Sequence, residues 1–342
     1  MAPKKVLFIS PLFDGSTSLM RFNAMKSILS NDYIIDTIDT QLIIDRYSRF
    51  NRSLAYRYKL GPVSLSINKK IKNDVKDKYY DIIWLEKGVL IKPSVVRILK
   101  SKSNTLIHFT PDPAFLFHKS NKFLNSINYY DLLITTKSFE LSHYYRYKSR
   151  ENVMLVTQGF SKELHESTVP FKKRKSSLIF IGHYEKNRSK TLQFLINSKI
   201  KIVLCGRGWN RFIEKNNNSP YFEFLGKKLY GDLYVNALNQ YKFSIGFLSE
   251  WIPEKHTTRT FEIPACGCIL ITPDNEEIRS FYTEDEVIFY ANDDELKIKL
   301  QNIFNNTVLS EKIARKGYQR TISSDNSHSK IMVEILEKVL NL

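Results

Sequence analysis

The sequence predicts an α/β protein made of two doubly wound parallel sheets in tandem. At 342 residues the chain is too long for one hydrophobic core and suits two domains of about 150–180 residues. Short β-rich runs alternate with amphipathic helical runs, a pattern typical of parallel α/β sheets. This alternation stops at a charged segment that contains Pro170 and then begins again, which indicates two separate sheets.

The first half contains six candidate strands, each a short run rich in β-branched and aromatic residues. They are residues 5–10, 33–39, 81–86, 105–110, 131–136 and 152–157. Helical patterns occupy residues 16–30 and 92–101. A longer basic insert, residues 41–78, is expected to form two helices broken at Gly61–Pro62.

The second half contains six further candidate strands. They are residues 177–182, 201–206, 222–226, 242–248, 268–272 and 286–291. We therefore expect a Rossmann-like N-terminal domain over residues 1–165, a linker at 166–176 and a Rossmann-like C-terminal domain over 177–325. The last stretch, residues 326–342, is expected to form a helix that packs back toward the N-terminal domain.

The amino-acid composition indicates in which cellular compartment the protein is expected. The chain is 42% hydrophobic and 25% charged, as ordinary soluble proteins are. No apolar run approaches the roughly 18 residues that span a bilayer. The apolar start of the chain is interpreted as a strand and not a signal peptide, because Asp14 follows too soon. Three cysteines suit buried thiols in a reducing cytoplasm, so we expect a cytoplasmic protein.

The net charge of +17 favours anionic partners. The sequence has no RRM signature and no Cys/His finger, so nucleic acid is not expected as a partner. An anionic membrane surface or a phosphorylated substrate fits the charge better, and the first of these would place the protein on the inner face of a membrane.

Glycines end three successive strands of the second half, and a basic residue follows each. The glycines are Gly182, Gly206 and Gly226, and the basic residues are Arg188, Arg207 and Lys227. Glycine lets a backbone approach a phosphate closely, although strand-to-helix turns also need glycine for their own geometry. The sequence shows neither a G-x-G-x-x-G fingerprint nor a P-loop, which disfavours NAD enzymes and P-loop NTPases.

The segment 256–267, HTTRTFEIPACG, is expected to form a short helix that a threonine caps and Gly267 ends. Glu262 is expected on the exposed side of this helix. A carboxylate there has two interpretations: a favourable charge near a helix start, or an acceptor for both vicinal hydroxyls of a ribose. In the second case Arg259, one turn earlier, would point toward a diphosphate.

A family resemblance adds to these observations. Glu254 and Glu262 are separated by seven residues, and IPACG follows Glu262. This spacing resembles the E-x7-E signature of retaining GT-B glycosyltransferases of the family 4 type. The run TTRTFEIPACGCILIT is similar to the spore-maturation branch of that superfamily, as are FIGHYEKNR and YFEFLGKK upstream. The resemblance covers residues 106–335 and is strongest over 178–272. The FG that usually follows the first glutamate is replaced here by Lys255–His256.

The resemblance implies two domains facing across a cleft and transfer of a sugar from a nucleoside-diphosphate sugar. Glu262 would hold the ribose, and Glu254 would lie beside the donor sugar. Arg188 and Arg259 would balance the diphosphate, and the backbone at Gly226 and Lys227 would meet the base. The full expected donor-binding set is Glu262, Arg259, Thr258, Arg188, Gly182, Gly206, Arg207, Gly226 and Lys227.

The N-terminal domain supplies the expected acceptor side. Asp14, Gly15 and Ser16 follow the first strand and are candidates for contact with an acceptor or a phosphate, although helix capping explains Ser16 equally well. Asp112 and His108 lie at the end of a strand, in IHFTPDP. Either would serve as the base of an inverting reaction, and His108 is alternatively a core residue.

No cofactor and no metal ion are expected, because the sequence has no Asp-x-Asp step. Fixed positive groups would then neutralise the leaving diphosphate. The acceptor is a glycan, a lipid-linked molecule or another acceptor. Four alternatives remain open: a non-catalytic nucleotide-sugar-binding protein, an inverting glycosyltransferase, a nucleotide-sugar epimerase and a basic nucleic-acid binder.

Overall fold

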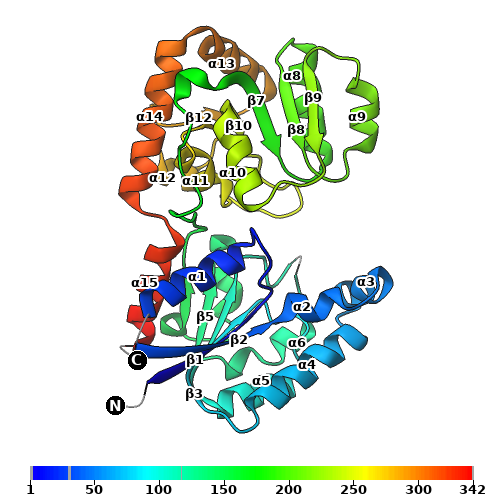
Figure 1. Ribbon diagram of the computed structural model, residues 1–342, viewed down its shortest axis with the longest axis vertical. Helices are drawn as coiled ribbons and strands as arrows, with labels where there is room; N and C mark the ends of the chain where they lie inside the picture. The colour runs from blue at the N-terminus through cyan, green and yellow to red at the C-terminus, as the bar shows by residue number, and fades with distance from the viewer. Residues whose placement is uncertain (1–2, 30–31, 117, 341–342) are drawn as a thin grey trace. The chain divides into compact units, whose positions relative to one another are not determined.

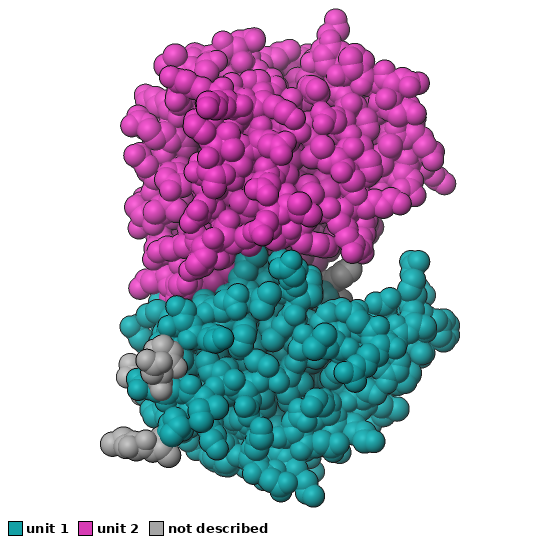
Figure 2. Space-filling view, viewed as in Figure 1, with its two compact units in different colours: residues 1–157, 331–342 teal, residues 158–330 magenta. Residues whose placement is uncertain are grey.

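The computed structural model describes residues 3–29, 32–116 and 118–340. The chain forms two compact units (Figure 2): residues 1–157 together with 331–342, and residues 158–330. The expected helix ends at Ser30 and at Asn341–Leu342 lie outside the described residues.

The first unit contains a six-stranded parallel sheet with the strand order β2-β1-β3-β4-β5-β6. Its strands are β1 (Lys4–Ser10), β2 (Tyr33–Asp39), β3 (Tyr80–Glu86), β4 (Ser103–Thr110), β5 (Leu132–Thr135) and β6 (Val153–Leu155). All six expected strands of the first half are therefore confirmed.

Helices cover both faces of this sheet. They are α1 (Thr17–Leu29), α2 (Thr40–Asp45), α3 (Arg49–Tyr58), α4 (Pro62–Val75), α5 (Pro93–Ser101), α6 (Asn121–Leu124), α7 (Leu141–Tyr144) and the end of α15 (His328–Leu340). Alternate residues of β1 enter different cores: Leu7 and Ile9 pack with α4 and α5, and Val6 and Phe8 pack with α1 and α15 (Figure 1). This alternation is the period of two that a strand buried on both faces requires.

The second unit contains another six-stranded parallel sheet, with the order β12-β11-β10-β7-β8-β9. Its strands are β7 (Lys175–Ile181), β8 (Ile202–Cys205), β9 (Phe222–Gly226), β10 (Tyr241–Ile245), β11 (Ile269–Pro273) and β12 (Ile288–Tyr290). Each coincides with an expected strand, so the predicted fold class of two doubly wound parallel sheets is confirmed.

Helices also cover both faces of the second sheet. They are α8 (Lys186–Asn197), α9 (Asn210–Asn216), α10 (Gly231–Gln240), α11 (Arg259–Ala265), α12 (Glu276–Phe281), α13 (Asp293–Asn305) and α14 (Thr307–Ser324). The helices α8, α9, α13 and α14 contribute to one core, and α10, α11 and α12 contribute to the other.

Residues 166–176, the expected linker, lie in the second unit, whose boundary falls between Thr157 and Gln158. Arg174 fixes this segment: its guanidinium donates to the carbonyl of Val169 (2.9 Å) and to the side chains of Ser167 (2.9 Å) and Asn239 (3.0 Å). The basic run that looked like solvated chain in the sequence therefore contains a buried anchor.

The strand order marks one position in each sheet where ligands bind in open parallel sheets. In the first sheet the chain passes from β1 to β2 on one side, and β3 then lies on the other side of β1. In the second sheet the chain passes from β7 to β8 on one side, and β10 lies on the other side of β7. Crevices form outside the carboxyl ends of the strands at such switch points. The residues that follow β1 and β3, and those that follow β7 and β10, are therefore the candidates for a functional site.

Candidate functional site

The loops that follow β7, β8 and β9 approach one another through glycines. A Cβ on Gly206 would lie 1.8 Å from the carbonyl oxygen of Gly182, so no other residue fits at Gly206. The Gly206 N–H donates to the carbonyl of Gly226 (2.9 Å). Gly226 has a φ of +133° and no atom within 4 Å of a Cβ built on it, and Lys227 beside it is exposed. Close backbone packing therefore explains why position 206 is a glycine. Gly226 leaves its backbone open at the same edge of the second sheet, the edge formed by the carboxyl ends of its strands.

Three of the expected basic residues gather at this edge. Arg188 comes from α8, Arg207 follows β8, and Arg259 begins α11. Burial lowers the pKa of His183, and the charges of Arg207, Arg188 and Arg259 lower it further. All three guanidinium groups therefore act on one imidazole in the loop that follows β7, with the carboxylate of Glu185 opposing them.

Arg188 ties two loops of the edge together. Its side chain is buried, with Nη2 lying 2.7 Å from Oε1 of Glu185. Its Nη1 donates to the carbonyl of His183 (3.2 Å) and Nη2 to that of Leu248 (3.3 Å). Glu185 also accepts from the backbone N–H of Glu250 (2.8 Å). The loop after β7 and the loop after β10 are thus held in one arrangement.

Arg259 is held less tightly. Its Nη2 donates to the carbonyl of Phe247 at 3.4 Å, and its buried Nε has no hydrogen-bond partner among the described residues. The Nε of Arg188 is likewise buried and without such a partner. Thr258, the residue before α11, makes no capping hydrogen bond through its side chain, contrary to the expected threonine cap. Two cationic donors at the edge therefore retain unused hydrogen-bonding capacity.

Glu262 is buried, which corrects the expectation of an exposed carboxylate. It retains 6% exposure because α11 is enclosed, with residues 260–265 all buried. The Tyr234 hydroxyl on α10 donates to Oε2 (2.9 Å), and Oε1 lies 3.8 Å from Nε2 of His165. Burial, followed by the Glu262 charge, raises the pKa of Tyr234 well above its ordinary value, so the tyrosine stays a donor. The carboxylate is therefore fixed in orientation.

Glu254 lies in the loop before α11. It accepts a hydrogen bond from the backbone N–H of Ser249 (3.1 Å), and its charge acts on the pKa of Arg188. Nearby, Nε2 of His256 accepts from the backbone N–H of Gln158 (2.9 Å), so its Nδ1 carries the proton and donates to Glu277. Glu254 thus lies at the same edge as the arginines. His256 fixes the loop that joins Glu254 to Arg259.

The expected acceptor-side loop follows β1 in the first unit. Asp14 is exposed, and Gly15 has a φ of +72°. Ser16 is buried, and its Oγ accepts from the N–H of Leu19 (3.1 Å) at the start of α1. Helix capping, one of the two interpretations of Ser16, therefore describes its side chain.

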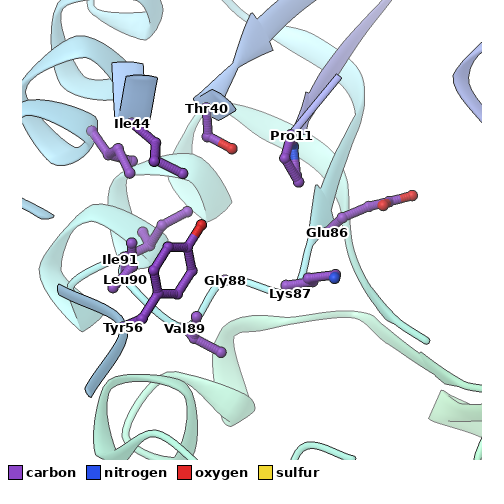
Figure 3. Close-up of a pocket in the computed structure, with 11 residues that line it drawn as sticks. Pro11, Thr40, Ile44, Tyr56, Glu86, Lys87, Gly88, Val89, Leu90 and Ile91 are labelled. Atoms are coloured by element: carbon purple, nitrogen blue, oxygen red, sulfur yellow. The ribbon is translucent and has the colours of Figure 1, made fainter. Parts of the chain in front are cut away.

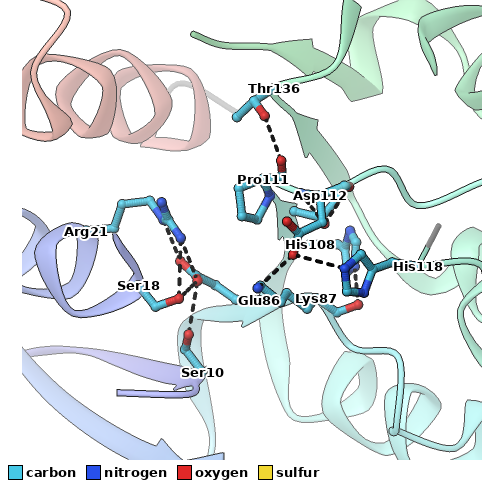
Figure 4. Close-up of polar contacts among 11 residues, drawn as sticks. Ser10, Ser18, Arg21, Glu86, Lys87, His108, Pro111, Asp112, His118 and Thr136 are labelled. Atoms are coloured by element: carbon cyan, nitrogen blue, oxygen red, sulfur yellow. Dashed lines mark hydrogen bonds and ion pairs between the residues drawn. The ribbon is translucent and has the colours of Figure 1, made fainter. Parts of the chain in front are cut away.

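Asp112 forms a polar cluster with Lys87 and His118 (Figure 4). Its Oδ2 lies 2.7 Å from the Lys87 ammonium and 3.7 Å from Nε2 of His118. Partial burial raises the pKa of Asp112, but the charges of Lys87 and His118 outweigh burial and lower the pKa overall. The carboxylate is therefore ionised near neutral pH.

Replacing Lys87 by methionine should raise the pKa of Asp112, because burial then acts without its main opposing charge. In the parent, a lowered folded pKa stabilises the fold above the unfolded pKa, and this contribution is lost as the pH falls through the folded pKa. Carboxyl-carbon NMR titration of Asp112 measures the shift. Lys100→Met, which removes the partner of Asp131 (2.7 Å), is the matched control and should leave Asp112 unchanged. An unchanged titration in the Lys87 variant would contradict the ion pair.

His108 lies in the core beneath this cluster and is 1% exposed. Its ring lies 4.4 Å from the ring of Phe123 and 5.0 Å from that of Tyr130, and burial lowers its pKa to about 4. Nε2 donates to the carbonyl of Lys87 (3.2 Å). A neutral imidazole enclosed by aromatic rings cannot reach a substrate, so the structure contradicts the expected role of His108 as a base.

A buried ion pair joins the carboxyl end of β3 to α1 (Figure 4). Arg21 donates through Nε to Oε1 of Glu86 (2.8 Å) and through Nη2 to Oε2 (2.9 Å). Ser18 (2.5 Å) and Ser10 (3.0 Å) also donate to Glu86. Burial raises the pKa of Glu86, but Arg21 and the two hydroxyls outweigh it and lower the pKa. This pair holds β1, β3 and α1 in register at the switch point of the first sheet.

A pocket of about 60 Å³ opens at that switch point (Figure 3). Thr40 and Tyr56 direct their hydroxyls into it, and Lys87, which has a φ of +63°, stands at its edge. Its lining residues are Pro11, Thr40, Ile44, Tyr56, Ile67, Glu86, Lys87, Gly88, Val89, Leu90 and Ile91. The first unit therefore offers a mainly apolar pocket with a few polar groups where the fold places ligands.

Sequence reasoning missed several of these residues. Tyr234 and the pair Arg21–Glu86 act through partners that lie 28 and 65 positions away in the chain. Glu185 pairs with Arg188 nearby, but it also accepts from the backbone of Glu250, 65 positions away. The one available signal was Glu86 itself, a carboxylate that ends the otherwise apolar strand DIIWLE. A charge in such a position requires a buried partner.

Two features are absent from the described residues. These residues contain no group of three His, Cys, Asp or Glu side chains arranged to hold a metal ion. Among the described helices, none is both long and apolar enough to cross a membrane.

Comparison with known proteins gives a family match and a fold match. Residues 188–337 match the family described as "Glycosyl transferase-like". Sucrose-phosphate synthase from Thermosynechococcus elongatus superposes with a TM-score of 0.72 at 12% identity, covering 98% of both chains. Anabaena HepE, solved with UDP and glucose, gives a TM-score of 0.66 at 14% identity, covering 99% of this chain and 100% of HepE.

A glycosyltransferase from Rickettsia africae gives a TM-score of 0.66 at 15% identity, covering 99% of this chain and 98% of the Rickettsia chain. No curated protein matches the sequence. At these identities the similar structures show the fold alone, and the family match independently covers most of the second unit. The resemblance inferred from the sequence is confirmed at the level of the fold: the chain has the GT-B fold, and its residues 188–337 are similar to the glycosyl transferase-like family.

Proposed function

We propose that this chain transfers a sugar from a nucleoside-diphosphate sugar to a carbohydrate or lipid-linked acceptor. The observation that carries the proposal is the gathering of Arg188, Arg207 and Arg259 around the loop after β7, next to the fixed carboxylate of Glu262. The switch point of an α/β sheet is where nucleotides bind, and three cations there suit a diphosphate. Anabaena HepE, which shares the fold, has been solved with UDP and with UDP-glucose.

Each residue of the edge has a proposed role toward the donor. Glu262 accepts hydrogen bonds from the ribose hydroxyls through Oε1, while Tyr234 holds Oε2. Arg259 and Arg188 donate their unused Nε–H groups toward the diphosphate. The backbone at Gly226 and Lys227 contacts the base. Thr258 and Arg207 line the same edge. Glu254 lies beside the sugar. These roles extend the family resemblance to the residues of this edge.

Charge balance supports transfer without a metal ion. When the glycosidic bond to the diphosphate breaks, negative charge accumulates on the leaving phosphate oxygens. Guanidinium groups that are fixed before the reaction stabilise this charge without reorganisation. Arg188 is fixed by Glu185 and by two carbonyls, so it meets this requirement. Activity in the presence of a chelator is the expected consequence.

We propose retention of anomeric configuration, on the basis of Glu254 and Glu262. The alternative is inversion, in which a carboxylate removes the proton of the attacking hydroxyl. Asp112 would be the candidate base there, because its lowered pKa keeps it ionised. The anomeric configuration of the product, read by proton NMR at the start of the reaction, distinguishes the two mechanisms.

The acceptor is proposed to bind in the first unit. The pocket between Tyr56, Thr40 and Lys87 lies at the carboxyl ends of β1 and β3, and the loop of Asp14, Gly15 and Ser16 follows the same β1. Its mainly apolar lining suits an acceptor with an apolar portion, and Lys87 suits one with a negative charge.

A thermal-shift panel of nucleoside diphosphates and their sugars tests the donor proposal. At least one diphosphate should raise the melting temperature of the parent, because a ligand that binds only the folded state stabilises it. Glu262→Ala should lose most of this response. Glu223→Ala, an exchange of the same type on β9 whose carboxylate pairs with Lys201 at 3.6 Å, is the matched control. An equal response in both variants would exclude Glu262 from the site.

A further inference from the structure

The α3–α4 hairpin exposes large apolar side chains. Lys59 and Gly61, both with positive φ, turn the chain between the two helices around Leu60. Five large apolar or aromatic side chains of this hairpin are exposed: Phe50 (75%), Tyr56 (47%), Tyr58 (59%), Leu60 (61%) and Leu65 (56%). Single exposed apolar residues are ordinary on soluble proteins, but five on one hairpin concentrate apolar surface there, as an interaction surface does.

The same hairpin carries much of the positive charge of the chain. Residues 49–76 contain eight Lys or Arg against one Asp, which is a net +7 out of the +17 of the whole chain. One face of α4 begins with Leu65 and continues with three lysines, at steps of four, three and four residues along the chain: Lys69, Lys72 and Lys76. The three lysines are exposed and form no ion pair among the described residues.

The outer face of α3 has the same character. Phe50 and Arg57 are seven residues apart and lie on one face, whereas Ala55 faces the core. Figure 1 shows α3 at the periphery of the first unit, next to α4. Both helices therefore combine apolar and cationic side chains on the surface that the core leaves uncovered.

We propose that the α3–α4 hairpin docks the protein on an anionic lipid surface. Phe50, Leu60 and Leu65 enter the boundary between headgroups and acyl chains, and the lysines pair with lipid phosphates. The lysine face favours a membrane over a protein partner, because protein interfaces are depleted in lysine. This inference does not depend on the donor chemistry of the second unit.

Vesicle flotation of the full chain tests the proposal. The parent should bind vesicles of phosphatidylcholine mixed with phosphatidylglycerol, and not vesicles of phosphatidylcholine alone. Binding should weaken as salt is raised, because salt screens the attraction. The triple variant Lys69→Gln, Lys72→Gln, Lys76→Gln should bind about a hundredfold more weakly, since each lysine near the surface contributes roughly fivefold. Phe50→Ser with Leu60→Ser should weaken binding by at least about tenfold.

Val308→Ser with Arg315→Gln is the matched control. Both residues are exposed on α14 of the second unit, so this variant loses an apolar and a charged group without touching the hairpin. It should bind within about twofold of the parent, and unchanged melting of every variant should accompany these results.

Three outcomes would overturn the proposal. The first is no binding to either vesicle, and the second is equal loss of binding in the control variant. The third is self-association in analytical ultracentrifugation that the Phe50 and Leu60 exchanges abolish while vesicle binding persists. That last result would assign the surface to a second copy of the chain.

Discussion

Replacing Arg21 by methionine is expected to destabilise the first unit by about 3–5 kcal/mol. Arg21 and Glu86 are both almost fully buried, and the guanidinium makes two hydrogen bonds to the carboxylate. Methionine keeps much of the arginine volume but leaves Glu86 as a buried charge without a cation. Hydrogen exchange of the β1 and β3 amides measures the loss, because a chain of two units does not have to unfold in one step.

The double variant Arg21→Met, Glu86→Gln separates charge from packing. It should be less destabilised than Arg21→Met alone, because no buried charge remains without a partner. The loss of stability in Arg21→Met should also become smaller at acidic pH. Glu86 stabilises the parent only above its unfolded pKa, and without Arg21 burial would raise its folded pKa, which favours the variant at low pH. A deficit that is independent of pH and equal in both variants would contradict the ion pair as the cause.

Replacing Arg259 by glutamine is expected to lower turnover about 10²- to 10³-fold, the usual effect of removing one donor that stabilises a leaving anion. The fold should survive, since the guanidinium donates only a long hydrogen bond among the described residues, to the Phe247 carbonyl at 3.4 Å. Calorimetric titration should show weakened binding of the nucleoside diphosphate that stabilises the parent best. Binding of the same nucleoside without its phosphates should change little, because it lacks the negative charge with which Arg259 is proposed to interact.

Two neighbouring arginines serve as comparisons for Arg259. Arg207 is exposed, so Arg207→Gln should cost much less, because exposed charges contribute little. Arg188 is buried against Glu185, so Arg188→Gln should destabilise the second unit as well as weaken binding. If Arg259→Gln weakened nucleoside and diphosphate binding equally, the diphosphate role of Arg259 would be wrong.

The sheets could be predicted because each strand is a local signal. In DIIWLE, KIVLCG or CILIT, the apolar run alone indicates a strand buried on both faces. The break at Gly61–Pro62 was visible for the same reason, since Pro62 occupies the first turn of α4. The short α2 helix escaped notice because its six residues continue directly from β2.

The side-chain arrangement at the site could not be predicted in this way. Glu262 is on a helix whose exposed face the sequence could not identify, because Tyr234 and His165, its neighbours, belong to distant elements. His108 lies inside an apolar run, and its burial depends on Phe123 and Tyr130, whose rings pack against it. Such partners become adjacent only when the sheet assembles.

A crystal structure with a bound nucleoside diphosphate, grown with a chelator, tests the central claim most directly. We predict that Glu262 lies within hydrogen-bonding distance of the ribose hydroxyls and that the guanidinium groups of Arg259 and Arg188 point at the diphosphate. A nucleotide bound away from Glu262, or one that binds only when a divalent cation is supplied, would contradict it.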